Sequence, residues 1–187
     1  MSQDNARQRQ VQLLRQFRKW HRLTGAGLFV FFFVVGITGL VLGWKKNSQG
    51  YILPQTQKGG STTITDWLPL DSLQKKAQRA LHKTYPDYST KIARLDVRPS
   101  KGMLKILFEE HHVGVQLDGA TGVVLSVAPR HSDWIENLHD GSLVDDCLGT
   151  KGYFKLFYTT IMGAALLLFT ITGFWLWYGP KRLRNNR

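Results

Sequence analysis

The chain has 187 residues and a formal net charge of +12, a value that raises the question of nucleic-acid binding. The charge distribution argues against it, because residues 47–152 contain 12 Lys and Arg and 12 Asp and Glu, so that the excess lies toward the two ends. The single cysteine, Cys147, excludes an intramolecular disulfide and the Cys-x-x-Cys-His attachment of c-type haem. We therefore predict no nucleic-acid partner and a central segment stabilised by packing alone.

A long apolar stretch near the N-terminus predicts a membrane-spanning helix at residues 23–44. Leu23–Leu42 is twenty residues without a charge, which at about 1.5 Å per residue covers a hydrocarbon core of about 30 Å. In lipid such a stretch must be helical, because its backbone has to satisfy its own hydrogen bonds. Trp20 and Trp44 frame it where aromatic side chains favour the membrane interface. Since no small-x-small cleavage site precedes Trp44, we interpret the stretch as an uncleaved signal anchor.

A second apolar stretch predicts a spanning helix at residues 153–178. Its only charge is Lys155, near the start, and an aromatic belt closes it. Basic residues are concentrated in the flanking segments 1–22 and 179–187, so the positive-inside rule predicts that both ends are cytoplasmic. The segment 45–152 is then predicted to lie outside.

The basic N-terminal segment before the first span has two parts. Residues 1–10 are polar and are expected to be disordered. Residues 11–20 have a helical period, which predicts an amphipathic approach lying on the inner leaflet. The corresponding C-terminal segment is predicted to be a short basic cytoplasmic tail.

Between the spans the sequence predicts a small α+β module at about residues 68–128. Residues 47–65 have loop composition, after which Asp71 is a candidate N-cap of a helix that ends at Pro86. Residues 129–152 are expected to be a juxtamembrane segment. Alternating or apolar runs predict about four short strands, at residues 92–97, 103–108, 113–117 and 123–127. One helix and these strands form an α+β module with a modest core.

Two patterns link the predicted spans. Ile37-Thr38-Gly39 is echoed by Ile171-Thr172-Gly173, each near the exit of its helix. Gly39-x-x-x-Gly43 and Thr159-x-x-x-Gly163 are small-x-x-x-small patterns, which let helix backbones approach closely. We expect these patterns to support helix pairing, within the chain or between chains.

Four short motifs, taken in order, give the chain its resemblance to the PepSY-associated transmembrane family. They are Trp20–Gly25, Val113–Leu125, Leu138–Gly141 and Ile171–Trp177. The resemblance covers about residues 17 to 182 and implies a bacterial inner-membrane protein whose PepSY module lies in the periplasm. Larger relatives, with about four spans, look like haem-containing reductases of ferric siderophores. PepSY modules elsewhere resemble propeptide-like inhibitors of proteases.

The fold class predicted from these features is a membrane α-helical protein with two transmembrane helices and a small α+β periplasmic PepSY-like domain inserted between them. The chain has two spans where the larger relatives have four. A homodimer or a partner membrane subunit would have to complete a four-helix bundle. Membrane lipid is the other expected partner.

The candidate cofactor residues are His21 and His139, as axial ligands of haem b. His21 lies at the inner end of the first predicted span, and His139 lies outside, about fourteen residues before the second. Their predicted depths differ by about the membrane thickness, so they cannot share one iron in a single chain. In a twofold dimer each histidine could pair with its symmetry mate, giving one site near each face. Alternatively, His21 bonds headgroups or a backbone carbonyl, and His139 caps the turn at Asp140-Gly141.

Other chemistry is weakly supported by the sequence. His111 and His112 are adjacent, so in a strand they point to opposite faces and cannot form one tight site, with or without Glu109 and Glu110. His131 forms a looser group with Asp133 and His139. No hydrolase or metalloprotease motif is present. We predict no catalytic residue, no metal site and no independent enzyme.

Two functions from different classes follow from the sequence. The first is an accessory subunit that supports haem-linked electron transfer across the inner membrane, for iron or siderophore reduction. The second is a tethered PepSY module that binds or regulates a periplasmic protease or receptor without redox chemistry.

Overall fold

The structure is a computed structural model that describes residues 2–185 and divides into two compact units. One contains residues 1–39 and 137–187, and we call it the helical unit. The other contains residues 40–136, and we call it the module. Both boundaries fall inside helices, within α1 (Ser2–Gly43) and α3 (His131–Asp140).

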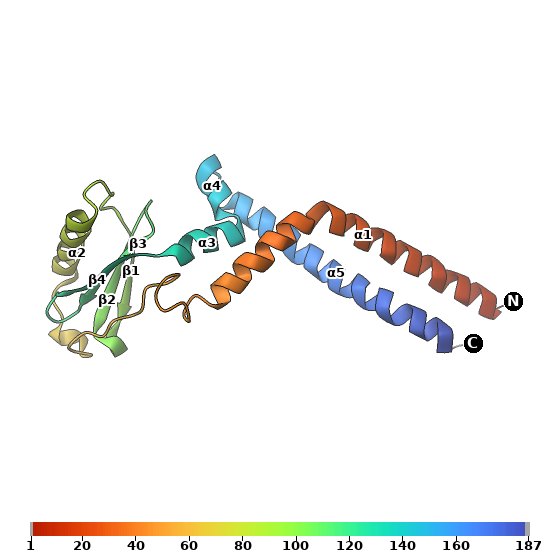
Figure 1. Cartoon of the computed structure of the whole chain (residues 1–187), viewed down its shortest axis with the longest axis horizontal. Coiled ribbons are helices and arrows are strands. Elements are labelled where there is room, and N and C mark those ends of the chain that lie inside the picture. The colour runs from red at the N-terminus through yellow and green to blue at the C-terminus, as the bar shows by residue number, and fades with distance from the viewer. Residues whose placement is uncertain (1, 186–187) are drawn as a thin grey trace. The chain divides into compact units, whose positions relative to one another are not determined.

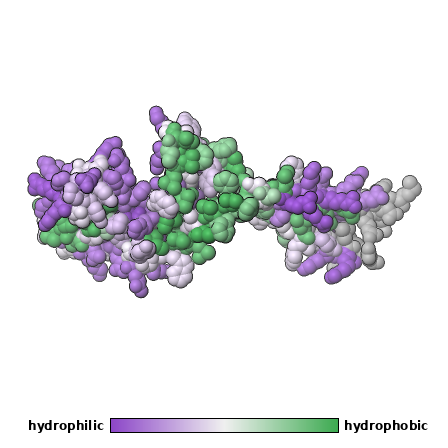
Figure 2. Space-filling view, turned by 45° about the horizontal axis from the view of Figure 1, so that its top comes forward, coloured by the Kyte–Doolittle hydropathy of each residue, from purple (hydrophilic) through white to green (hydrophobic). Residues whose placement is uncertain are grey.

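The helical unit is built on two long helices, α1 and α5 (Tyr153–Asn185) (Figure 1). Both are long and apolar enough to cross a membrane, over Gln8–Gly43 and Tyr153–Arg182. Figure 2 shows hydrophobic residues gathered over the middle of these helices and hydrophilic residues toward the termini. The prediction of two spanning helices is confirmed.

The two long helices extend further than the sequence predicted. α1 is helical from Ser2, where residues 1–10 were expected to be disordered and 11–20 to lie on the leaflet as a separate segment; Met1 lies outside the described residues. α5 continues through Pro180, inside the predicted tail, of which residues 186–187 are not described. Tertiary packing is the physical reason, because the two extensions lie against each other.

That packing places a leucine side chain directly on a glycine. A Cβ placed on Gly179 would lie 2.5 Å from Cδ2 of Leu14, so a larger residue there would require the Leu14 side chain to move. One turn further along, Phe17 and Trp175 lie with their ring centroids 6.3 Å apart and nearly parallel. The small-x-x-x-small patterns contribute differently, since a Cβ on Gly43 or Gly163 would meet nothing within 4 Å. Their use in pairing between chains stays a prediction.

The segment before α5 is helical rather than a simple link. α3 and α4 (Ser142–Leu148) occupy most of predicted segment 129–152. Asp145 on α4 is buried, and its carboxylate accepts hydrogen bonds from the Thr150 hydroxyl and from the backbone N–H groups of Gly152, Phe154 and Lys155. It thus satisfies donors that the first turn of α5 would leave without partners.

The module is an antiparallel four-stranded sheet in the order β1-β2-β3-β4, with α2 (Leu70–Thr84) over one face (Figure 1). The predicted strands are confirmed as β1 (Ile92–Arg98), β2 (Met103–Phe108), β3 (Val113–Asp118) and β4 (Val124–Pro129). Short 3-10 turns lie at Ile64–Asp66 and Pro99–Lys101. The core is formed by fully buried side chains of α2 and the sheet: Leu73, Ala77, Leu81, Leu104, Ile106, Val115 and Leu117.

The start of α2 corrects one expectation. The N-cap is Pro69, which makes no side-chain cap hydrogen bond, and not Asp71. Asp71 lies in the first turn, where its charge is favourable to the helix dipole, and its carboxylate is 3.5 Å from Nζ of Lys75.

The opposite face of the sheet is polar and is covered by the segment that enters the module. Gln116 is 2% exposed; its Oε1 accepts a hydrogen bond from the N–H of Gln57, and its Nε2 donates to the carbonyl of Gln55. Arg98 donates to the hydroxyl of Thr56 in the same segment. Lys105, in the strand between Arg98 and Gln116, is 3% exposed.

Candidate functional site

The helical unit contains two histidine–threonine contacts. Nδ1 of His21 on α1 lies 2.8 Å from Oγ1 of Thr172 on α5. Nδ1 of His139, at the end of α3, lies 2.8 Å from Oγ1 of Thr38 on α1. Thr172 is fully buried, and Thr38 is 6% exposed. Each predicted cofactor residue is therefore held by one threonine of the repeated Ile-Thr-Gly sequence.

The hydrogen bonds of the two threonines favour one tautomer of the histidines. Oγ1 of Thr172 lies 2.6 Å from the carbonyl of Leu168, and Oγ1 of Thr38 lies 2.7 Å from the carbonyl of Val34. A hydroxyl has one proton, so when that proton is donated to the carbonyl, each oxygen accepts from the imidazole Nδ1–H. In the neutral imidazole Nε2 then carries a free lone pair, the arrangement in which histidine ligates a metal while its other nitrogen donates to the protein.

The glycines of the repeated sequence lie beside the imidazoles. A Cβ on Gly39 would make an ordinary van der Waals contact with Cε1 of His139 at 3.4 Å, and a Cβ on Gly173 would make one with Cε1 of His21 at 3.8 Å. We call each threonine with its following glycine a Thr-Gly cradle. The repetition noticed in the sequence thus corresponds to two sites of the same construction, although the sequence alone did not single out the threonines.

The structure does not bring the two histidines together. The cradle for His139 begins at Thr38, seventeen residues along α1 from His21, which is about 25 Å along a helix axis. One chain therefore offers two separate nitrogen ligands. Neither site contains a second histidine within the described residues.

The surroundings of the two histidines differ. The edge of the His21 ring faces Phe169, with ring centroids 4.6 Å apart. Next to His139, Asp140 accepts hydrogen bonds from the N–H and hydroxyl of Ser142 and forms an ion pair with Lys155. Burial raises the pKa of Asp140, but Lys155 and Ser142 outweigh that effect and leave the pKa below its ordinary value. The turn is therefore capped by Asp140, and not by His139 as one reading of the sequence proposed.

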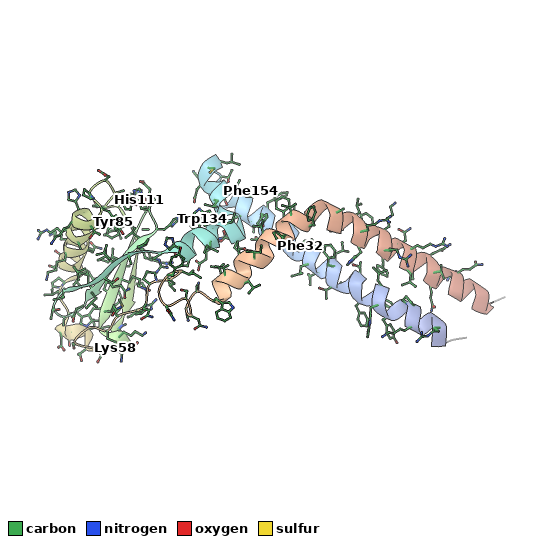
Figure 3. All side chains as sticks on the ribbon, in the orientation of Figure 1. Phe32, Lys58, Tyr85, His111, Trp134 and Phe154 are labelled. Atoms are coloured by element: carbon green, nitrogen blue, oxygen red, sulfur yellow. The ribbon has the colours of Figure 1, made fainter. Side chains whose placement is uncertain are left out.

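The other histidines lie in the module and belong to different contacts. His111 stacks on Tyr88 at 4.0 Å between ring centroids, and Tyr88 stacks on Tyr85 at 4.8 Å. Figure 3 labels Tyr85 and His111 at the same end of the module. His131 lies against Tyr51. Among the side chains that the structure describes, in residues 8–182 and 184, no three His, Cys, Asp or Glu are grouped closely enough to hold a metal ion.

Comparison with known proteins adds one finding. A family model described as "PepSY-associated TM region" matches residues 11–187, which is nearly the whole chain. No curated protein matches, and no solved structure matches.

Proposed function

Because the chain belongs to the PepSY-associated TM family, we propose that this membrane protein is an accessory subunit supporting electron transfer across the bacterial inner membrane. The observation that carries the proposal is the pair of Thr-Gly cradles, each of which leaves Nε2 of a histidine free to bind iron. His21 and His139 would each hold haem b through one axial bond. Haem, when bound, accepts and passes on single electrons.

The chain's own residues would orient the ligands. The Thr172 and Thr38 hydroxyls would hold each ring through Nδ1, and the adjacent glycines lie beside the rings. A second axial nitrogen at each site would come from a second copy of the chain or from a partner membrane subunit. In a twofold dimer like histidines meet, so each copy would contribute to one site toward each end of the helix pair.

We place the termini in the cytoplasm and the module in the periplasm. The net charge of +12 arises outside the neutral segment 47–152, and basic flanks favour the cytoplasmic side. Reporter fusions at Asp87 are expected to be active only for a periplasmic reporter. A fusion at this site that is active only for a cytoplasmic reporter would overturn the orientation.

A spectrum of the purified protein tests the redox proposal. The full chain, produced with ample haem supply and solubilised in detergent, is expected to show a Soret band that His21→Ala and His139→Ala each weaken. His82→Ala is the matched control, since His82 is an exposed residue of α2 in the module. A colourless preparation with native helix content would reject haem-linked electron transfer by the isolated protein. So would a band that neither cradle variant changes.

A second candidate function is binding of a periplasmic protease or receptor by the module. It is supported by the stack of Tyr85, Tyr88 and His111 beside a turn in which Glu110 and His112 have positive φ. Such backbone conformations are costly for residues other than glycine and concentrate at functional sites. Iron reduction requires no partner at this end of the module, whereas regulation does.

Photo-crosslinking in cells separates the two functions. A photoreactive residue at position 111 is expected to give a defined adduct if the module regulates a partner. The control position is Lys58, an exposed residue labelled toward the other end of the module in Figure 3. Equal labelling from both positions, or none from position 111, would reject the binding function.

A further inference from the structure

A groove of about 290 Å³ lies between the extension of α1 and the end of α5. Its walls are apolar, with Leu13, Leu14 and Phe17 on one helix and Trp175 on the other, and Gln10 and Arg182 stand at its polar end. The groove is just below the range for ligand sites, roughly 300–1,000 Å³, so it suits a narrow occupant. Leu13 is 56% exposed, although it lines an apolar surface.

The depth of the groove identifies the type of occupant. Its residues on α1 lie on the N-terminal side of Leu23, where the uncharged run begins, and its residues on α5 begin in the aromatic belt, at Trp175. Aromatic side chains of this kind lie at the level of lipid headgroups. An apolar groove at that level is reached by an acyl chain from the membrane side and by a headgroup from the polar side.

The charge around the groove is of one sign. Residues 8–22 and 176–185 contain eight basic side chains and no Asp or Glu. Lys181 lies over the ring of Trp177, 3.8 Å from its centroid. Among residues 8–182 and 184, whose side chains the structure describes, no ion pair involves any of these eight side chains. The surroundings therefore complement an anionic headgroup.

We propose that this groove binds one anionic phospholipid of the membrane, with an acyl chain along Leu14, Phe17 and Trp175 and the phosphate beside Arg182. The lipid would cover the exposed apolar side chain of Leu13. It would also fill the space that remains beside the contact between Leu14 and Gly179. This inference is independent of haem, because the site contains neither His21 nor His139.

Native mass spectrometry of the full chain with added lipid tests the proposal. Phosphatidylglycerol is expected to give one tightly bound molecule per chain, retained longer than phosphatidylcholine. Arg182→Gln is expected to weaken binding about fivefold, the factor that corresponds to about 1 kcal/mol for one basic side chain at an anionic surface. Arg184→Gln is the charge-matched control, since Arg184 does not line the groove.

A second pair of variants tests the groove itself. Leu13→Trp fills it and is expected to abolish the tightly bound lipid, whereas Gln12→Trp, on the neighbouring position of α1 outside the groove, leaves it in place. Circular dichroism checks that the helix content is retained. Equal retention of both lipids, equal effects of the two arginine variants, or tight binding by Leu13→Trp would each overturn the proposal.

Discussion

Removal of the positive charge of Lys105 is expected to stabilise the module at neutral pH. Lys105 is 3% exposed on the polar face of the sheet, where Arg98 forms an ion pair with Asp96 and Arg130 forms one with Asp133. No side-chain hydrogen bond or ion pair within the described residues engages the Lys105 ammonium. Lys105→Met keeps an unbranched side chain, one atom shorter, and leaves two balanced ion pairs.

The size of the effect follows from the pKa. Burial, together with the positive charges of Arg98 and Arg130, lowers the pKa of Lys105 from 10.5 to about 8, while Asp96 and Asp133 partly oppose this shift. Each pKa unit corresponds to about 1.4 kcal/mol, so the charged form costs the folded state at most about 3 kcal/mol at pH 7. Because the unfolded state binds more protons between pH 8 and 10.5, stability rises with pH in that window. By pH 9.5 the remaining cost is about 1.4 kcal/mol.

Hydrogen exchange of the full chain in detergent measures the effect of the Lys105 charge on the stability of the module. Peptides from β2 and β3, corrected for intrinsic exchange rates, report the free energy of opening of the module at pH 7 and pH 9.5. At pH 7 the free energy of opening is expected to be larger for Lys105→Met than for the wild type. The difference between the two free energies is expected to be smaller at pH 9.5. The control is Lys101→Met, which removes an exposed charge from the turn before β2. A smaller free energy of opening for Lys105→Met than for the wild type at pH 7, or a difference that stays the same at pH 9.5, would refute the reasoning.

Three further substitutions test contacts of the helical unit. Thr172→Val removes a buried hydroxyl and is expected to destabilise the helix pair by about 0.6 kcal/mol and to redistribute the imidazole tautomers in ¹⁵N NMR; Thr170→Val, an exposed neighbour, should do neither. Gly39→Leu is expected to displace the imidazole of His139 from its cradle and to shift the NMR resonances of His139. Gly36→Leu meets open space and should leave them unchanged. Asp145→Asn removes a carboxylate that accepts hydrogen bonds from the start of α5, so hydrogen exchange there should increase. Burial raises the pKa of Asp145, but these hydrogen bonds outweigh burial and leave the pKa below its ordinary value. In the wild type, hydrogen exchange at the start of α5 should increase in the same way only as the pH falls below about 3.8. Unchanged protection in Asp145→Asn would contradict the role of the Asp145 carboxylate as an acceptor.

Periodicity was sufficient to predict the module, because local alternation marks its strands. Leu104, Lys105 and Ile106 alternate in sequence, and the structure places the two apolar side chains in the core as expected. The burial of Lys105 could not be predicted in this way. A lysine on the second face of a strand is usually exposed, and it is covered here by the loop that contributes Gln55 and Gln57.

The candidate site was predictable in part. The histidines and the repeated Ile-Thr-Gly sequence were visible, but their pairing crosses between elements far apart in the chain. No local pattern links His21 to Thr172 or His139 to Thr38. The length of α1 was missed for the same reason, because Leu14 and Phe17 gain their partners only when α5 lies beside them.

The crossed arrangement of the Thr-Gly cradles has a mechanical consequence. His21 on α1 is held by α5, while the histidine that precedes α5 is held by α1. A slip of α1, which carries both His21 and Thr38, by a single residue would turn its contact face by about 100° and move it by about 1.5 Å. Both imidazoles would then lose their partners in one event, so the two ends of the helix pair respond together to any change of register.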